Sequence, residues 1–155
     1  MPKDGKKAEK KIYSLFTHAK KEIDIVMYTF TNKKLARALK IAAKKGVKIT
    51  IIADNEESKY KYSQIPKLAL IKNIKVYLLS GKNYYNSKNK AKMHVKLSII
   101  DKKTTILGSA NYSYSAFYKN YEYILINDKD KYLTKRFYAF FHHLKILSTP
   151  YRLSR

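Results

Sequence analysis

The feature that most constrains the fold is a series of β-branched segments separated by stretches with helical periodicity. Three segments rich in Ile, Val and aromatic residues are typical of buried strands: 23–30, 47–53 and 74–79. Residues 33–45 carry Leu and Ala at helical spacing, with Asn32 or Thr31 as the candidate N-cap and Gly46 as the stop. A strand, a helix and a strand in this order predict parallel pairing through a right-handed crossover.

The rest of the chain continues the α/β pattern. We predict further helices at 6–21, 64–72 and 128–147, a loop at 80–92, a hairpin of strands at 95–100 and 104–107, and a last strand at 121–126. The sum is an α/β fold, a mixed β-sheet flanked by helices on both faces. We find no linker or low-complexity block, so residues 1–155 are expected to form a single domain.

Charge and composition limit the partners. The chain has 34 Lys and Arg against 11 Asp and Glu, a formal charge of +23, which favours a polyanion such as nucleic acid or an anionic membrane. Compositional drift is an alternative source of part of the excess, because Lys, Asn, Ile and Tyr share A+T-rich codons. The lack of Cys excludes a disulfide framework, a zinc finger and a thiol nucleophile.

Membrane and targeting signals are absent from the sequence. No run of about 18 apolar residues occurs, so no spanning helix is expected. Residues 1–11 lack the apolar core of a signal peptide. Both a native start and the loss of a targeting segment fit this beginning.

Residues 93–111 hold the pattern with the clearest chemical meaning. On a strand, His94, Lys96 and Ser98 share one face, and the apolar residues between them share the other. Across the hairpin, Ser109 and Asn111 also share a face. One imidazole, one fixed cation and two neutral hydrogen-bond donors suit a phosphate whose negative charge grows in the transition state. Taken alone, a His-x-Lys pair more often occurs on a half-exposed strand where neither polar residue has a functional role.

The full pattern is H-x-K-x4-D-x6-G-S-x-N, and every position is met: His94, Lys96, Asp101, Gly108, Ser109 and Asn111. It resembles the phospholipase D superfamily, the HKD enzymes. Residues 25–31 with the following helix, and residues 46–54, resemble the first strand, helix and second strand of that family. The likeness covers roughly residues 6–147. The pattern is most similar to the single-motif bacterial Nuc-type endonucleases and to the related mitochondrial cardiolipin hydrolase/piRNA-pathway nuclease.

The number of motifs bears on the oligomeric state. Larger phospholipase D enzymes carry two HKD motifs that meet at one site, whereas this sequence has one. The resemblance therefore implies a half-unit that homodimerises, with an active site completed by the second copy across a two-fold axis.

The resemblance also implies a reaction. His94 attacks phosphorus to give a covalent phosphohistidine, while the partner subunit's His94 protonates the leaving oxygen and later activates water. Lys96, Ser109 and Asn111 hold the non-bridging oxygens. The Lys96 ammonium groups of the two subunits supply the positive charge, so neither a metal nor another cofactor is expected. Glu122 is expected to hydrogen-bond the His94 ring and fix its tautomer. A glutamate on an edge strand facing water is the alternative.

Asp101 is expected to have a structural role. It lies an odd number of residues from His94, so a regular strand directs its side chain to the opposite face. We therefore predict an ion pair or a turn contact rather than proton transfer, and we treat Gly108 as a structural residue of the motif.

The substrate depends on other residues, because this chemistry acts on any phosphodiester. The 80–92 loop leads into the catalytic strand and combines lysines, which can track phosphates, with tyrosines, which can stack on unpaired bases: Lys82, Tyr84, Tyr85, Lys88, Lys90 and Lys92. We assign Phe30 and Thr31 the same nucleic-acid-binding role. Residues 59–62 have a similar mix, and Tyr112, Tyr114 and Tyr118, which follow Asn111, fit either a groove or the core. A solvated loop rich in Lys and Tyr is the alternative.

The leading hypothesis is a metal-independent endonuclease of low sequence specificity that cleaves DNA, single strands in preference, with RNA as a further candidate. The first alternative is a phospholipid (cardiolipin-type) phosphodiesterase at an anionic membrane, against which the polar loop argues. The second is a non-catalytic nucleic-acid-binding module, against which the intact His94 and Lys96 argue. The resemblance also implies a bacterial protein that is exported, periplasmic or membrane-anchored, with membrane association through an N-terminal segment outside this sequence.

Overall fold

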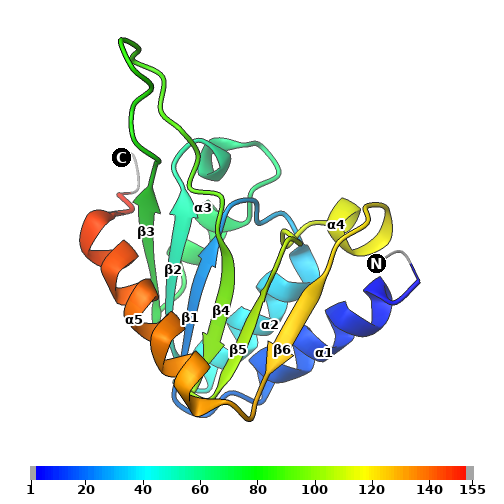
Figure 1. Cartoon of the computed structure of the whole chain (residues 1–155). Coiled ribbons are helices and arrows are strands. Elements are labelled where there is room, and N and C mark those ends of the chain that lie inside the picture. The colour runs from blue at the N-terminus through cyan, green and yellow to red at the C-terminus, as the bar shows by residue number, and fades with distance from the viewer. Residues whose placement is uncertain (1–2, 153–155) are drawn as a thin grey trace.

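One mixed sheet organises the computed structural model, which describes residues 3–152 (Figure 1). The strands are β1 (Glu22–Met27), β2 (Lys48–Asp54), β3 (Ile74–Leu79), β4 (Lys96–Ile100), β5 (Thr104–Gly108), β6 (Ile124–Asn127) and β7 (Thr149–Pro150). The helices are α1 (Gly5–Thr17), α2 (Lys33–Lys44), the short 3-10 helix η1 (Glu57–Lys59), α3 (Ile65–Ala69), α4 (Tyr114–Tyr118) and α5 (Lys131–Leu147). The predicted extent of 1–155 includes residues 1–2 and 153–155, which lie outside the described residues.

The strand order is β6-β5-β4-β1-β2-β3-β7, so β1 and β4 lie at the centre. β1 pairs in parallel with β2, and β2 with β3, which confirms the predicted β-α-β unit. β4 runs antiparallel to β1, and β5 and β6 continue as antiparallel neighbours. Because Met27 at the end of β1 pairs with Lys96 at the start of β4, the chain after β1 meets the segment that carries the motif.

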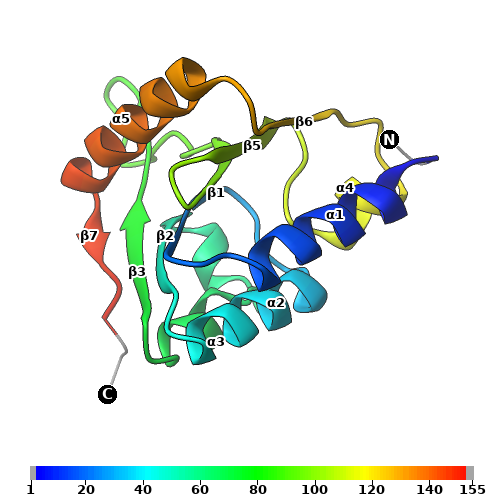
Figure 2. The same ribbon diagram turned by 90° about the horizontal axis from the view of Figure 1, so that it is seen from below.

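Helices cover both faces of the sheet, as predicted; Figure 2 shows α5 on one face and α1, α2 and α3 on the other. Under α5 lies a smaller apolar cluster in which Leu97 and Ile99 of β4 join Phe141. On the opposite face, the Ser98 hydroxyl lies 2.6 Å from the Tyr112 hydroxyl. The alternation of β4 therefore separates its polar side from its apolar side. No helix within residues 3–152 is long and apolar enough to cross a membrane.

Helix α2 begins and ends at residues that the sequence marks. The Asn32 side chain accepts a hydrogen bond from the Leu35 N–H at 2.9 Å, so Asn32, not Thr31, is the N-cap. After the last turn, Gly46 adopts φ +90°, a conformation that a residue with a Cβ rarely takes. These two residues fix the length of the helix between β1 and β2.

Several boundaries differ from the sequence prediction. The helix predicted at 64–72 contains only Ile65–Ala69, and the last strand begins at Ile124 instead of residue 121. Two helical turns, η1 and α4, and the short strand β7 were not predicted. These three elements span five residues or fewer and show no clear hydrophobic period in the sequence, so the contacts of the folded chain define them.

Candidate active site

The residues of the motif gather at the carboxyl end of β1 and the start of β4. The Tyr28 N–H donates to the Val95 carbonyl at 3.1 Å, which continues the pairing of the two strands one step past β4. His94 directly precedes Val95 in the chain. In open α/β sheets ligands bind beyond the carboxyl ends of the parallel strands, so the motif lies where a ligand site is expected.

His94 and Lys96 are in direct contact. Lys96 Nζ lies 2.9 Å from His94 Nδ1 and donates to the His94 carbonyl oxygen at 2.8 Å. The Lys96 side chain is 8% exposed. Burial lowers the pKa of Lys96, and the negative charge of Glu122 opposes that shift. The result is an ammonium group held rigidly beside the imidazole.

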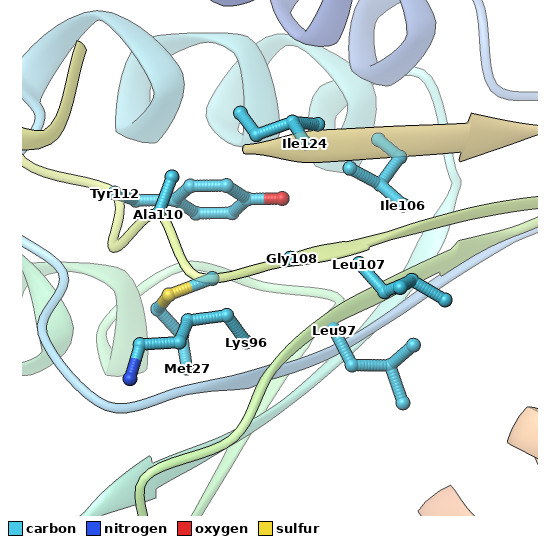
Figure 3. Close-up of a pocket in the computed structure, with 9 residues that line it drawn as sticks. All are labelled: Met27, Lys96, Leu97, Ile106, Leu107, Gly108, Ala110, Tyr112 and Ile124. Atoms are coloured by element: carbon cyan, nitrogen blue, oxygen red, sulfur yellow. The ribbon is translucent and has the colours of Figure 1, made fainter. Parts of the chain in front are cut away.

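The stem of Lys96 borders a small apolar cavity (Figure 3). Met27, Leu97 and Tyr112 are among its lining residues, and the cavity holds about 10 Å³. A volume of this size accommodates at most one water molecule. The cavity is therefore part of the packing that supports Lys96, and it is too small to hold a substrate.

The surroundings of His94 favour a neutral ring. Loss of hydration lowers the pKa of His94 most, and the positive charges of Lys96 and Lys92 lower it further, while Asp54 acts in the opposite direction. The Tyr28 ring lies 4.6 Å from the imidazole, centroid to centroid. A neutral imidazole is the form that can attack an electrophile, so the site disposes His94 toward nucleophilic attack.

The Lys96 contact also determines which nitrogen of His94 carries the proton. A charged ammonium only donates hydrogen bonds, so Nδ1 accepts and a neutral ring carries its proton on Nε2. Attack by Nε2 needs the other tautomer, in which Nδ1–H donates to an acceptor. The observed arrangement is therefore a resting state of the ring.

Glu122 does not contact the His94 ring within the chain. Its Oε2 accepts a short hydrogen bond from the Ser109 hydroxyl, and its Oε1 accepts from Asn120 Nδ2 at 3.2 Å. The prediction that Glu122 hydrogen-bonds His94 is thus wrong for the single chain. Because β6 begins only at Ile124, Glu122 lies in the connection before the strand and reaches the end of β5 instead.

Ser109 and Asn111 follow β5, and each is tied to a different neighbour. The Ser109 hydroxyl donates to Glu122 and accepts from the Tyr123 N–H at 3.2 Å, so its one proton is already engaged. Asn111 Oδ1 accepts from the Thr29 N–H at 3.3 Å. This bond directs the amide so that its Nδ2 is the group able to donate to a phosphate oxygen.

The other two motif residues shape the backbone. A Cβ at Gly108 would collide with the backbone carbonyl of Tyr123, so only glycine lets β5 approach the segment that carries Glu122.

At the far end of β4, the Asp101 carboxylate accepts backbone N–H bonds of 2.7–3.0 Å from Lys20, Lys21 and Glu22. Burial raises the pKa of Asp101, but these donors outweigh it and the pKa is lowered. Asp101 therefore joins the start of β1 to the hairpin turn.

The 80–92 loop follows β3 and projects beyond the end of the sheet where β4 begins (Figure 1), and His94 lies two residues before β4. The six residues of this loop that the sequence assigned to nucleic-acid binding are all exposed, and Tyr85 is 94% exposed. Lys92 approaches the catalytic residues, with its Nζ 5.4 Å from the centroid of the Tyr28 ring. The loop thus presents cations and aromatic rings next to the site.

The two remaining nucleic-acid assignments have different outcomes. Phe30 is 2% exposed and packs edge-on against Tyr112 at 5.3 Å, so it cannot stack on a base, and this assignment was wrong. The chain turns inward after β1, because Phe30 forms a bridge with Tyr112. Thr31 is partly exposed and lines an open hollow.

Two residues near His94 were missed in the sequence. Tyr28 packs its ring against the imidazole, and Asp54 accepts from the Met93 N–H at 2.9 Å, one residue before His94. Asp54 also accepts from the Glu56 and Glu57 N–H groups, so it anchors the catalytic segment to the end of β2. Their position directly after β1 and at the end of β2 was the available signal, because parallel strands end at the same edge.

With this geometry established, the chain can be assigned to a family. The family model described as "Cardiolipin synthase, PLD-like domain" matches residues 12–145. The chain therefore belongs to the phospholipase D superfamily, a family of phosphodiesterases, as the motif predicted.

Individual relatives agree with this assignment. The chain is similar to NucT from Helicobacter pylori, with a TM-score of 0.93 and 33% identity, and the match covers 97% of this chain and 95% of that chain. Nuc from Salmonella typhimurium, a phospholipase D family member, gives a TM-score of 0.78 at 25% identity and covers 94% of this chain and 91% of that one. Human mitochondrial cardiolipin hydrolase is 26% identical over 129 residues, 83% of this chain and 48% of its own length. The chain spans about half the length of such curated relatives.

Proposed function

We propose that this chain cleaves the phosphodiester bonds of nucleic acid without a metal ion, through a covalent phosphohistidine on His94. The observation that carries the proposal is the 2.9 Å contact between His94 Nδ1 and the buried Lys96 ammonium. A nucleophile with a lowered pKa and a fixed cation beside it are the two groups that attack on a phosphodiester requires.

Substrate binding would convert the resting site into the reactive one. A phosphate attracts the Lys96 ammonium more strongly than a neutral imidazole does, so Lys96 turns to the non-bridging oxygens and releases Nδ1. The ring can then carry its proton on Nδ1 and attack through Nε2. The Asn111 Nδ2 donates to a second oxygen.

The mechanism needs a second acid–base group, which the proposal takes from a second copy of the chain. The leaving oxygen must receive a proton, and His94 cannot supply it while bonded to phosphorus. The single HKD motif supports a homodimer in which the two His94 rings face one phosphate. In that pair two Lys96 side chains supply the positive charge that a metal ion would otherwise provide.

Nucleic acid is favoured over lipid by the surface around His94. The formal charge is +23, and the neighbouring loop is polar, with Lys82, Lys88, Lys90 and Lys92 exposed. These features suit a phosphate backbone. Cardiolipin hydrolysis is the second candidate, favoured by the similarity to proteins named mitochondrial cardiolipin hydrolase. A location outside the cytoplasm stays a prediction from the resemblance.

The test offers the purified chain four substrates in excess EDTA: single-stranded DNA, duplex DNA, RNA and cardiolipin vesicles. We expect endonucleolytic cleavage of single-stranded DNA at a rate that EDTA leaves unchanged within about twofold, and no turnover of cardiolipin. Activity that EDTA removes and a divalent metal restores would refute the metal-free mechanism. Faster turnover of cardiolipin than of any nucleic acid would assign the lipid function instead.

A further inference from the structure

Two open hollows flank the segment 55–64 at the His94 end of the sheet. The first, of about 590 Å³, lies between this segment and the 80–92 loop, and its lining includes Asp54, Glu56 and Glu57 beside three lysines. The second, of about 510 Å³, lies between residues 60–67, the chain after β1 and the start of α4. We call the second the α3–α4 hollow; its main side chains are Lys33, Tyr60, Lys61, Tyr62, Lys67 and Tyr114.

The charges distinguish the two hollows. Among the described residues that line the α3–α4 hollow, none is acidic, and its three lysines are exposed. The hollow beside the loop combines three carboxylates with its lysines. The α3–α4 hollow attracts the phosphates of a nucleic acid, whereas the carboxylates of the hollow beside the loop partly repel them, so the α3–α4 hollow is the better path for a polyanion.

Tyr114 is held as a stacking platform. Its ring lies 4.9 Å from that of Tyr118 at an interplanar angle of 23°. The Tyr118 hydroxyl donates to Glu9 Oε2 at 2.8 Å, and Glu9 also accepts from Asn32 and Lys34 at 2.7 Å each. One face of Tyr114 is thus supported by an anchored ring, while the residue remains 63% exposed. An exposed, supported aromatic face is what an unpaired base requires.

Tyr60 and Tyr62 form a second aromatic group across the hollow. Their ring centroids are 5.3 Å apart in an edge-on arrangement, and they are 50% and 56% exposed. Lys61 Nζ lies 4.8 Å from the Tyr62 centroid. Rings alternating with lysines provide both contacts that a single strand makes, stacking for its bases and charge for its phosphates.

The hollow lies close in the chain to Asn111 of the catalytic motif. Ser113, which lines it, is two residues beyond Asn111, so its Cα lies within about 8 Å of the Asn111 Cα. The Thr31 N–H donates to the Tyr112 carbonyl at 2.9 Å, which joins the chain after β1 to the same segment. This proximity to Asn111 gives an oligonucleotide with its phosphate at the catalytic residues a short route into the hollow.

We infer that the α3–α4 hollow binds the unpaired nucleotides adjoining the cleaved phosphate, with bases on Tyr62 and Tyr114 and phosphates on Lys33, Lys61 and Lys67. The inference rests on the proposed nuclease function and specifies where the strand runs. It also gives single strands a structural advantage, because a base in a duplex is already stacked and paired and cannot open onto a tyrosine ring.

The first experiment measures binding of a fluorescent single-stranded oligonucleotide of about 12 nucleotides by anisotropy, in a His94→Ala background so that the probe stays intact. Tyr62→Ala and Tyr114→Ala are each expected to raise Kd about tenfold, whereas the Tyr→Phe variants keep the ring and bind within about twofold. In the chain with intact His94, the same Tyr→Ala variants should hydrolyse bis(p-nitrophenyl) phosphate, which is too small to reach the hollow, at the normal rate.

The second measurement tests the lysines through salt. Replacing Lys33, Lys61 and Lys67 by alanine should reduce the slope of log Kd against log salt by about 2, since each phosphate contact to a single strand contributes about 0.7. The matched control replaces the exposed Lys44, Lys48 and Lys75 at the opposite end of the sheet, and we expect a change in slope below about 0.5.

Three outcomes overturn the inference. Unchanged oligonucleotide binding by the tyrosine variants shows that bases do not stack there. An equal reduction of the salt-dependence slope by the two triple-lysine replacements shows that only the overall charge of the protein attracts the oligonucleotide. Weaker binding to cardiolipin vesicles with normal oligonucleotide binding assigns the hollow to a lipid surface. Binding is measured without turnover. A chain that binds the oligonucleotide in the hollow but cleaves neither the oligonucleotide nor bis(p-nitrophenyl) phosphate therefore refutes the proposed function and not the inference about the hollow.

Discussion

His94→Ala is expected to reduce phosphodiester cleavage by about 10⁴-fold or more, because the variant loses the nucleophile and, in the homodimer, the general acid as well. His94 lies before β4 and its side chain is exposed, so the replacement leaves the packing of the sheet unchanged. Melting temperature and oligonucleotide binding should therefore remain near those of the wild type. Cleavage rates of a labelled single-stranded substrate, measured in EDTA, provide the test.

The matched control is His142→Ala, which removes an exposed histidine from α5 on the far face of the sheet. This variant should cleave at the wild-type rate. Residual activity above about one tenth in a properly folded His94→Ala preparation would contradict the assignment, as would an equal loss of activity in the control.

Lys96→Met is expected to lower kcat/KM by about 10²–10³-fold, the usual cost of removing one group that stabilises transition-state charge. Methionine keeps most of the apolar stem beside Met27 and Leu97 but removes the ammonium. Because Lys96 contacts the His94 ring, its loss should also alter the pH dependence of the reaction, which a purely structural lysine would leave unchanged.

The direction of the pH effect follows from the charge. Desolvation lowers the pKa of His94 most, and the positive charge of Lys96 is the next cause. Removing that charge raises the pKa of His94 toward its ordinary value, so less of the ring is neutral at a given pH. The acidic limb of the kcat/KM profile should therefore move to higher pH in Lys96→Met, and by less in Lys92→Ala. Movement to lower pH, or activity within threefold of the wild type, would contradict the role of Lys96.

The central sheet was predictable because its signals are local. Residues 95–99 alternate with a period of two, which placed Lys96 and Ser98 on one face and Leu97 and Ile99 on the other. The same parity placed Asp101 away from His94, where its carboxylate holds the start of β1. Asn32 and Gly46 marked the ends of α2 through capping chemistry that depends only on neighbouring residues.

The misassigned residues depend on contacts between distant segments. Phe30 is buried because the chain after β1 turns in to bridge Tyr112, 82 positions further along. Glu122 accepts a hydrogen bond from Ser109 because β6 begins at Ile124 and not at the predicted residue 121. Glu122 therefore lies in the segment before the strand, beside the end of β5. The α3–α4 hollow joins three separate segments, so neither its volume nor its lack of carboxylates can be seen in any one stretch of sequence.

The most direct test of the central claim is mass spectrometry of the protein quenched in alkali during rapid turnover, conditions under which a phosphohistidine survives. The account predicts a nucleotidyl or phosphoryl adduct on the peptide containing His94, in at most half of the chains, because the partner's His94 serves as the acid. An adduct on another residue, an adduct on every chain, or a burst of product with no adduct would contradict it.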